Sequence, residues 1–436
     1  MTIARRPENP EPDLDLQSRA VAGGMTADDG LPERTVFVAR QPILDRHLEV
    51  FGYELLFRSG RQNFHCFHDG DQATRLTVSN ALNVMGLNDL VSGKKAFVNI
   101  TRNLLLQEFH AVLPLKQGVV ELLETVEPDE EVIAACRAMK EEGYLLALDD
   151  FVFSPRYQPL LDIADIVKVD FLATDRRERR ALIENSRRPG LVFLAEKVEG
   201  HQEFEEGLAL GYALFQGYFF SKPKIVESRD FVGAKHKYML FLQEVHSPEL
   251  DFDRLEKVVK SDASLSVKLL RYLNSAGMGV RERITSIKQA LILLGEKPLR
   301  KWASLVALTC IGEDKPSELI RLSLARAHFC ESLCSDLKMT GRELDLFLLG
   351  LLSALDAMLD CSPEDLVEQL PLATDVKTTL LGGSGTLGKV YMLVQACEHA
   401  DWKTACLLGR LLEIEVARIN ETYSHSLRWA DEVMRI

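Results

Sequence analysis

The sequence has little that would suit secretion, membrane insertion or broad binding of nucleic acid. Acidic residues outnumber basic ones, 65 to 52, and the net charge of −13 opposes a wide basic face of the kind that binds nucleic acid. No apolar run approaches the roughly 20 residues of a membrane-spanning helix. Met1–Pro32 is acidic and lacks the apolar core of a secretory signal peptide. We therefore expect no membrane span, no export and no nucleic-acid partner.

The cysteines also lack any pattern of a disulfide framework or a common metal site. The eight cysteines are scattered and contain no Cys-x-x-Cys pair. Cys330 and Cys334 lie one turn apart on a predicted helix and could bind metal together, but core packing is the more common role of such residues. We therefore predict a cytoplasmic protein from a reducing compartment.

What remains is an ordinary globular composition with a change of pattern along the chain. The 436 residues are 46% hydrophobic and 27% charged, which suits two or three domains. We expect a flexible acidic segment over residues 1–33, which are rich in Pro, Asp, Glu and Gly, a first domain over 34–228 and a second over 229–436.

Two adjacent acids follow a short apolar run within the first domain. In Tyr144–Phe151, YLLALDDF, the run Leu145–Leu148 leads directly into Asp149 and Asp150. Such a run predicts a strand buried on both faces, as in a parallel sheet. Carboxylates this close repel each other and favour a bound cation, which a divalent metal could supply. The alternative is a strand end before a helix, whose first turn also favours acids.

Strand patterns alternate with helical spacing through the whole first domain. Thr35–Ile43 and Val50–Phe57 form a predicted hairpin. The later strands alternate with predicted helices over Asp71–Met85, Leu104–Val112, Glu130–Lys140, Arg176–Ser186 and His201–Leu210. This alternation indicates βα units and a parallel sheet. About eight strands over about 190 residues fit a closed barrel better than an open sheet. We predict an α/β TIM-like (β/α)8 barrel followed by an all-α helical domain.

Polar side chains follow almost every predicted strand of this barrel. They are Glu54, Asn99, Glu121 with Glu124, Asp149 with Asp150, Lys168 with Asp170, Glu196 with Glu199, and Gln216. In a (β/α) barrel the carboxyl ends of the strands meet at one mouth. Each residue alone could be a helix cap or a solvated loop acid, but together they predict an acidic, metal-binding mouth.

The ligand types indicate which metal this mouth would hold. Glu54, Asn99, Glu121 and Asp149 offer oxygen without sulfur or imidazole, which suits Mg²⁺ or Mn²⁺ better than Zn²⁺. Asp150 could help to hold a second ion, with Asp149 as the bridge. Two ions roughly 3.5–4 Å apart can generate hydroxide and stabilise an in-line displacement, for which a phosphodiester is the natural substrate.

Two basic residues near the acids each have two interpretations. Lys168 would orient or help to deprotonate the attacking water, or it would be a salt-bridge partner that makes the acids tolerable. Arg58 would bind a substrate phosphate, or it would be a surface charge at a strand end.

Seven motifs of the first domain resemble those of the EAL family, whose active members hydrolyse the bacterial second messenger cyclic di-GMP. Their order and spacing agree from Val36 to about Pro223. The motifs are Glu54-Leu55-Leu56-Phe57-Arg58, Phe97-Val98-Asn99-Ile100, Glu121-Leu122-Leu123-Glu124, Leu148-Asp149-Asp150-Phe151, Val167-Lys168-Val169-Asp170, Ala195-Glu196-Lys197-Val198-Glu199 and Phe215-Gln216-Gly217-Tyr218. The resemblance implies a phosphodiesterase that needs Mg²⁺ or Mn²⁺, yields the linear dinucleotide pGpG and forms a homodimer through the barrel.

The resemblance also implies a role for each matched residue. Glu54, Asn99, Glu121 and Asp149 resemble ligands of one metal ion, and Asp149 and Asp150 those of a second. Lys168 resembles the residue on the nucleophilic water, with Glu196, Glu199 and Gln216 as further site residues. Arg58 and Asp170 are expected on the substrate side, and Glu124 resembles the acid that supports the loop after the paired aspartates.

Three places depart from the family pattern and leave the function open. Leu55 replaces an Ala and Lys197 a Gly, and Val152–Ser154 replaces the Gly-Thr-Gly that follows Asp-Asp-Phe in the family. Glycine permits backbone conformations that Val and Phe do not, so we expect this loop to take another shape. The leading hypothesis is an active phosphodiesterase, and the alternative is a receptor that binds cyclic di-GMP without hydrolysis. A pure interaction scaffold is opposed by the cost of so many unpaired buried carboxylates.

From about residue 229 the spacing is helical throughout. Ile287, Ala290, Leu291 and Leu294 give one buried helix face, and Gly295 fits its end. The second domain resembles the HDOD domain, a relative of metal phosphohydrolases thought to have lost catalysis. The resembling pieces are Asp262–Asn274, Ile287–Gly295 and Arg321–Cys330. No histidine after residue 230 precedes an Asp, so we expect no metal site there but a non-catalytic output or scaffold domain with a protein partner.

Overall fold

The computed structural model describes residues 36–59, 86–186, 188–223, 234–262, 265–269 and 286–435. The predicted flexible segment over residues 1–33 and a predicted helix over Asp71–Met85 lie outside the described residues. Among the described helices, none is both long and apolar enough to cross a membrane.

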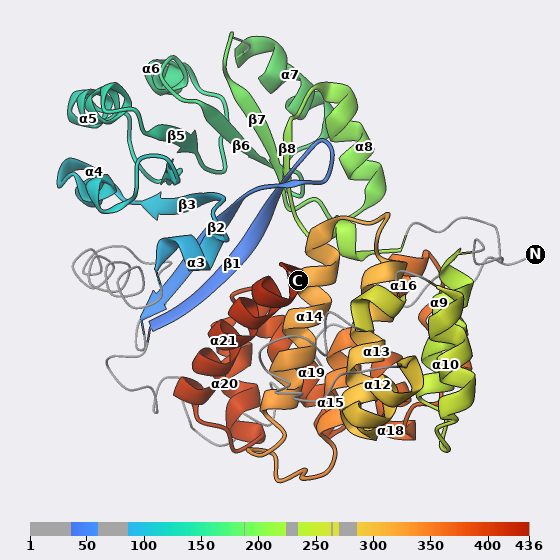
Figure 1. Ribbon diagram of the computed structural model, residues 1–436. Coiled ribbons are helices and arrows are strands. Elements are labelled where there is room, and N and C mark those ends of the chain that lie inside the picture. Colours follow the sequence, from blue (N-terminus) through green and yellow to red (C-terminus); the bar gives the residue numbers. More distant parts are fainter. Residues whose placement is uncertain are drawn as a thin grey trace, which may run out of the picture.

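The first half is a closed eight-stranded barrel (Figure 1), as the sequence predicts. The strands follow one another around the barrel in chain order, and β1 closes it by pairing with β8. Strand β1 runs antiparallel to both of its neighbours, and the other adjacent strands are parallel. The strands are β1 (Val36–Asp45), β2 (Val50–Ser59), β3 (Lys95–Ile100), β4 (Gly118–Leu122), β5 (Leu145–Leu148), β6 (Ile166–Asp170), β7 (Val192–Glu196) and β8 (Leu214–Gln216).

A layer of apolar side chains fills the barrel interior and explains where the polar layer lies. The buried members, one from each strand except β2, are Ile43, Phe97, Val119, Ala147, Ile166, Leu194 and Leu214. Because strand side chains on one face recur every second residue, the next inward position is two residues further along. On β3 to β8 that position holds the polar residues Asn99, Glu121, Asp149, Lys168, Glu196 and Gln216.

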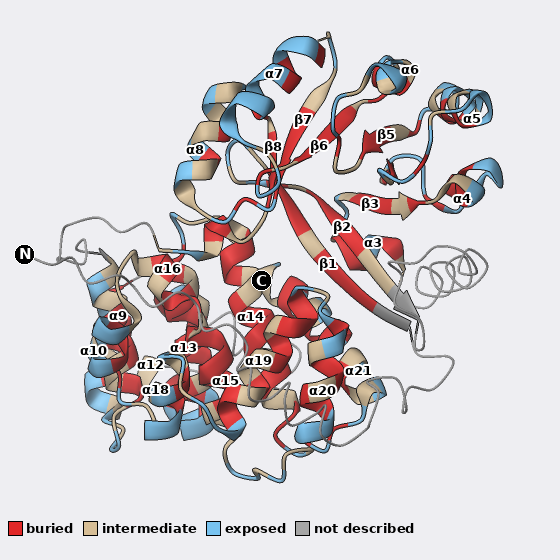
Figure 2. Cartoon of the chain, turned by 180° about the vertical axis from the view of Figure 1, so that it is seen from behind, coloured by how far each residue is buried: buried red, intermediate tan, exposed pale blue. Residues whose placement is uncertain are grey.

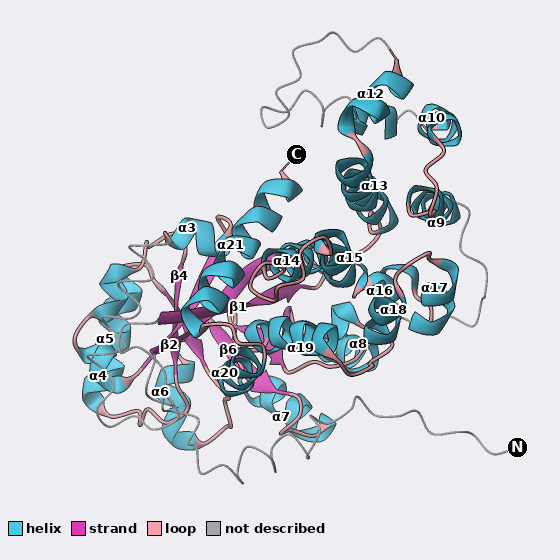
Figure 3. Cartoon of the chain, turned by 90° about the horizontal axis from the view of Figure 1, so that it is seen from below, coloured by secondary structure: helices cyan, strands magenta, loops and turns pink. Residues whose placement is uncertain are grey.

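Helices surround the strands on the outside of the barrel, and α4 to α7 lie on the side away from the second half (Figure 3). They are α3 (Leu87–Val91), α4 (Arg102–Leu106), α5 (Glu130–Glu141), α6 (Gln158–Leu161), α7 (Arg176–Ser186) and α8 (His201–Leu210). The Asp129 side chain caps α5 by accepting a hydrogen bond from the Val132 amide, and Thr101 caps α4 in the same way. The predicted helix over Leu104–Val112 is instead α4 and a separate 3-10 turn over Phe109–Val112.

The second half is helical in every element that the structure describes, as predicted. The helices are α9 (Ala234–Val245), α10 (Phe252–Ser261), α12 (Ile287–Leu294), α13 (Glu296–Ile311), α14 (Ser317–Ser332), α15 (Glu343–Leu352), α16 (Leu355–Leu359), α17 (Pro363–Gln369), α18 (Thr374–Leu380), α19 (Thr386–Glu398), α20 (Trp402–Leu411) and α21 (Val416–Met434). His328 stacks on Trp429 with ring centroids 4.9 Å apart.

The two halves share a packed boundary along β1 and β2. Helices α19 and α21 contact β1, and α21 also contacts α3. Ala39 and Leu56 belong to a hydrophobic cluster formed mainly by helices of the second half. Both strands are largely buried there, whereas α5, α6 and α7 expose their outer faces (Figure 2). The second half therefore covers β1 and β2 on the outside of the barrel, where other strands are covered by barrel helices.

Candidate functional site

The polar layer of the barrel gathers four carboxylates around one ammonium group. We call Glu54, Glu121, Asp149 and Glu196 the acidic cluster. Lys168 Nζ lies 2.6 Å from a Glu196 oxygen, 2.9 Å from Asp149 and 3.3 Å from Glu54, and it also bonds Glu121. The Lys168 side chain is 1% exposed and that of Glu121 is fully buried. One buried ammonium thus faces four carboxyl groups, so the cluster favours further cations.

The surroundings raise the pKa values of Glu196, Glu121 and Lys168. Burial, with Asp149 and Glu54 nearby, raises the pKa of Glu196 to about 8 although Lys168 opposes the shift. Burial and the Glu54 carboxylate raise the pKa of Glu121 as well. Although burial opposes its charge, Lys168 has a pKa raised by the four carboxylates. A firmly protonated lysine is a poor proton acceptor, so this geometry favours an orienting or charge-pairing role for Lys168 over that of a base.

Glu54 is held in place by three neighbouring strands. The Asn99 amide donates to Glu54 Oε1 at 3.1 Å, and the Gln216 amide donates to Glu54 Oε2 at 2.7 Å. The same Gln216 nitrogen is 2.9 Å from Gln41 Oε1, and Gln41 pairs directly with Glu54 across β1 and β2. Gln41 is a site residue that our strand-end reasoning missed. Since β1 runs the other way, its inward position next to the apolar Ile43 lies two residues earlier, not later.

The oxygens of the acidic cluster are of the kind that binds a divalent metal ion. Two groups of three carboxylates have ligand atoms within 4.8 Å of one another, namely Glu54 with Glu121 and Glu196, and Asp149 with Asp150 and Glu196. Buried oxygens Asn99 Oδ1, Glu121 Oε2 and Asp150 Oδ1 have no hydrogen-bond partner among the described residues. Unpaired buried oxygens are costly, and carboxylate and amide oxygens of this kind are ligands that suit a divalent cation. Glu196 belongs to both groups, although from the sequence it was expected only as a further site residue of the metal-binding mouth.

The end of β8 needs a glycine beside the site. Gly217 has φ 142°, and a Cβ built on it would lie 2.1 Å from the Val198 carbonyl oxygen. Val198 in turn bonds the Gln216 carbonyl through its amide. Any side chain at position 217 would therefore push apart the ends of β7 and β8 that carry Glu196 and Gln216.

Asp150 and Asp170 face a lysine that the family pattern does not predict. Lys197 forms an ion pair with Asp170 and lies 3.7 Å from Asp150 Oδ2. Although burial opposes it, hydrogen bonds from Lys197 and from the Ala173 and Leu172 amides lower the pKa of Asp170. Asp170 therefore takes part in the turn after β6 and lies next to the second carboxylate group, not within it. Lys197 and Asp150 both have positive φ angles, 54° and 39°.

Three other predicted residues lie apart from the cluster or cannot be placed. Glu124 is exposed in the turn after β4, and Glu199 is exposed with its carboxylate 3.7 Å from Lys222 Nζ. Their predicted roles stay predictions. The backbone of Arg58 lies in β2, paired with Phe37 of β1, and the structure does not describe its side chain.

The loop after Asp150 exposes apolar side chains. Val152 is 73% exposed and Phe153 38%, whereas Phe151 is buried and its amide bonds the Lys168 carbonyl at 3.0 Å. Phe151 thus fixes the start of the loop against β6. Of the residues at the positions of the family's Gly-Thr-Gly, Val152 and Phe153 are exposed and Ser154 is partly buried.

Removal of the Lys197 charge is expected to strengthen metal binding near Asp150. Lys197→Gly takes away an ammonium that competes for Asp150 and relieves a left-handed backbone, so the affinity for Mn²⁺ should rise about two- to fivefold, the scale of a half-exposed ion pair. Titration of the full chain with Mn²⁺ measures this. Lys197→Met, which removes the charge and keeps a side chain, should show most of the gain. Unchanged affinity in both variants would contradict the prediction.

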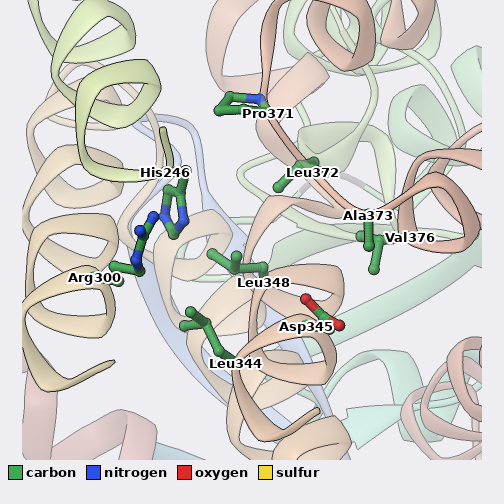
Figure 4. A pocket seen from close by; sticks show the side chains of 9 residues that line it. All are labelled: His246, Arg300, Leu344, Asp345, Leu348, Pro371, Leu372, Ala373 and Val376. Carbon is green, nitrogen blue, oxygen red and sulfur yellow. The ribbon is translucent and has the colours of Figure 1, made fainter. Parts of the chain in front are cut away.

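A cavity of about 140 Å³ lies in the second half, apart from the acidic cluster (Figure 4). His246 and Arg300 form one wall, and α15 and α18 contribute the other. Burial, with Arg300 nearby, lowers the pKa of His246 to about 4, and its Nε2 lies 2.7 Å from Ser304 Oγ. Arg300 donates to the Val245 and Ser247 carbonyls. These polar groups join α9 to α13, and we assign no ligand to the cavity.

Comparison with known proteins finds relatives that match nearly the whole chain and a family model that matches part of the second half. Residues 235–379 match the family model of the HDOD domain, which confirms the prediction for the second half. The protein of Vibrio cholerae serotype O1 (strain ATCC 39315 / El Tor Inaba N16961) named cyclic di-GMP phosphodiesterase CdgJ is 40% identical over 410 residues, which cover 92% of this chain and 94% of CdgJ. The chain belongs to the CdgJ family. The uncharacterized protein YuxH of Bacillus subtilis (strain 168), also similar, is 36% identical over 409 residues, 92% of this chain and 99% of YuxH.

Two solved structures resemble about half of the chain. The Klebsiella pneumoniae BlrP1 complex with calcium and cyclic di-GMP is 21% identical, covers 51% of this chain and 68% of that one, and has a TM-score of 0.37. The FimX EAL domain from Pseudomonas aeruginosa, bound to cyclic di-GMP, is 16% identical, covers 51% and 100%, and has a TM-score of 0.35. These scores are too low to support an argument, so membership in the CdgJ family rests on sequence identity over nearly the whole chain.

Proposed function

We propose that this chain is a metal-dependent phosphodiesterase that hydrolyses cyclic di-GMP to linear pGpG. The observation that carries the proposal is the acidic cluster at the barrel mouth, where Glu121 Oε2 and the nearby Asn99 Oδ1 and Asp150 Oδ1 have no hydrogen-bond partner among the described residues. The positions of the cluster are those that resemble the EAL motifs, and the CdgJ relative carries the name of this activity.

The position of each residue suggests which metal ion it would bind. Glu54, Asn99, Glu121 and Asp149 would hold one divalent ion, and Asp149 with Asp150 a second. Glu196, which belongs to both carboxylate groups, would lie within reach of both ions. Mg²⁺ or Mn²⁺, when bound, supplies a hydroxide nucleophile at neutral pH and offsets the charge that develops on the phosphate.

Lys168 and Gln216 would act around these ligands. Lys168 stays an ammonium, orients the attacking water and stabilises the negative phosphate oxygens. Gln216 keeps Glu54 turned toward the cluster. The apolar layer beneath closes the barrel, so substrate and water reach the cluster from the mouth alone.

Turnover of cyclic di-GMP by the purified full chain, with Mg²⁺ or Mn²⁺, tests the proposal. A parallel binding titration in Ca²⁺, where turnover is expected to be suppressed, separates binding from catalysis. Formation of pGpG supports the phosphodiesterase. Binding without product in every metal would overturn it in favour of a receptor, the second candidate, for which the altered loop with exposed Val152 and Phe153 speaks.

Arg58→Ala is expected to weaken cyclic di-GMP binding in Ca²⁺ about ten- to a hundredfold. A charge-assisted hydrogen bond to phosphate is worth about 1.5–3 kcal/mol, which corresponds to that range. Arg180→Ala, which removes an exposed arginine of α7, serves as the control and should bind as the wild type does. Equal binding by both variants would remove Arg58 from the site.

The proposal also covers the division of the chain into two domains and the partners of each domain. We place the division near residue 228, in a stretch that lies outside the described residues. The barrel would form a homodimer, and the HDOD half would bind a protein partner as a non-catalytic output domain.

A further inference from the structure

The outer faces of β1 and β2 carry two side chains that reach helices of the second half. Tyr53 is 1% exposed, and its hydroxyl donates to Glu318 Oε2 on α14 at 2.9 Å. Arg40 is buried beside it, with its guanidinium carbon 4.6 Å from the centre of the Tyr53 ring. A polar pair of this kind is unusual on the outside of a barrel strand, where apolar contacts suffice.

These side chains belong to a buried network of charges between the two halves. Arg40 donates to both carboxylate oxygens of Asp431 on α21, at 3.2 and 3.3 Å. Arg321 of α14 pairs with Asp431 and lies 3.0 Å from Glu318. Two arginines thus face two carboxylates, so the network is electrically balanced and its geometry is specific.

A second contact joins the second half to β8. The Tyr218 hydroxyl donates to the Glu398 carbonyl at 3.0 Å, and its ring lies on that of His399 with centroids 4.2 Å apart. The Glu398 carboxylate is fixed by two 2.8 Å hydrogen bonds from Arg326. Strands β8, β1 and β2 are neighbours in the barrel, so both contacts act on one side of it.

On these strands, each outer residue lies beside a residue of the site. Arg40 precedes Gln41 on β1 and Tyr53 precedes Glu54 on β2, whereas Tyr218 lies just past the end of β8, two positions after Gln216. Inside the barrel, Gln216 bonds both Glu54 and Gln41. Tyr53 and Glu54 are consecutive residues whose side chains point to opposite faces of β2. A shift of the strand at Tyr53 therefore also moves the Glu54 carboxylate.

We propose that the helical half sets the position of Glu54 in the acidic cluster, through Tyr53, Arg40 and Tyr218 as positioning residues. The inference rests on the proposed function, since it takes the cluster as the metal site. Glu318 and Asp431 hold the outer side of the β1–β2 pair, and the inner side then presents Glu54 toward Glu121 and Glu196. The barrel of this chain thus has a metal site that is complete only when the helical half is docked.

Titration of the full chain with Mn²⁺, together with thermal unfolding, tests the proposal. Tyr53→Phe keeps the ring and removes the hydrogen bond to Glu318, so Mn²⁺ binding should weaken roughly three- to tenfold with the fold retained. Glu318→Ala should weaken it to a similar degree. The double variant should be no weaker than the stronger single effect, because both changes break the same contact.

Tyr144→Phe is the matched control, since it removes a buried tyrosine hydroxyl that donates to the Leu113 carbonyl at 3.0 Å away from the helical half. Its Mn²⁺ affinity should equal that of the wild type. Equal affinity in Tyr53→Phe, or an equal loss in the control, would overturn the proposal. Mn²⁺ bound by the wild type without turnover would overturn the proposed function alone, and no Mn²⁺ binding by the wild type would overturn both.

Discussion

Glu54→Gln is expected to reduce turnover of cyclic di-GMP at least about a thousandfold. Loss of this carboxylate removes one ligand from the group that Glu54 forms with Glu121 and Glu196. Stabilisation of the transition state by a bound metal ion is worth several kcal/mol. A loss of about 4 kcal/mol corresponds to a factor of about a thousand. Initial rates of pGpG formation at saturating Mn²⁺ measure the effect, and a parallel titration shows whether Mn²⁺ still binds.

Glu130→Gln is the control for Glu54→Gln because it removes an exposed carboxylate from the first turn of α5 on the same barrel. It should leave turnover unchanged. If Glu54→Gln kept more than about a tenth of the wild-type rate, less than 1.4 kcal/mol would separate them, and Glu54 would not be a metal ligand in the reaction.

Lys168→Met is expected to destabilise the metal-free protein by about 3–5 kcal/mol, the cost of leaving buried charges without their partner. The four carboxylates then repel one another, and proton binding by some of them reduces this repulsion. Glu196 already has a pKa of about 8, raised above its unfolded value, so its contribution to stability is complete at low pH and is lost as the pH rises through about 8. The deficit of the variant should therefore be largest above that pH.

Urea unfolding in EDTA and in Mn²⁺ tests the prediction for Lys168→Met. Because cations replace the missing ammonium, Mn²⁺ should restore most of the stability while turnover stays low. Lys140→Met is the control, since Lys140 pairs with Asp165 at 2.6 Å in a half-exposed position, and it should cost about 1 kcal/mol or less. A variant that is as stable as the wild type in EDTA would show that the carboxylates do not depend on Lys168.

Local chemistry was enough to predict most of the barrel. The run Leu145–Leu148 forms β5 with the predicted bounds, and α7 over Arg176–Ser186 and α8 over His201–Leu210 also match. These segments combine a clear period with polar or glycine boundaries. Where the period is short, as over Leu104–Val112, the residues alone did not show that the helix divides.

The site was predictable to the extent that parallel strands place their polar ends together. Glu54, Glu121, Asp149, Lys168 and Glu196 converge as expected. Gln41 did not follow from the same rule, because β1 is antiparallel and presents its inward polar residue before the apolar one. Glu124 and Glu199 lie past their strand ends, where the chain turns outward into solvent.

The contacts between the halves could not be read from the sequence. Arg40 and Asp431 are separated by 391 positions, and neither lies in a motif with a chemical meaning of its own. Only the packing of α14 and α21 against β1 and β2 makes them partners.

The pairing of β1 with α21 also bears on how the protein is made. During synthesis the first described strand leaves the ribosome long before the helix that neutralises its arginine. Until then, Arg40 and Tyr53 face water on an uncovered side of the growing barrel, and long-range closure of this kind is slow. A chain that stops before residue 416 would therefore keep this side of β1 uncovered and open to chaperones and proteases.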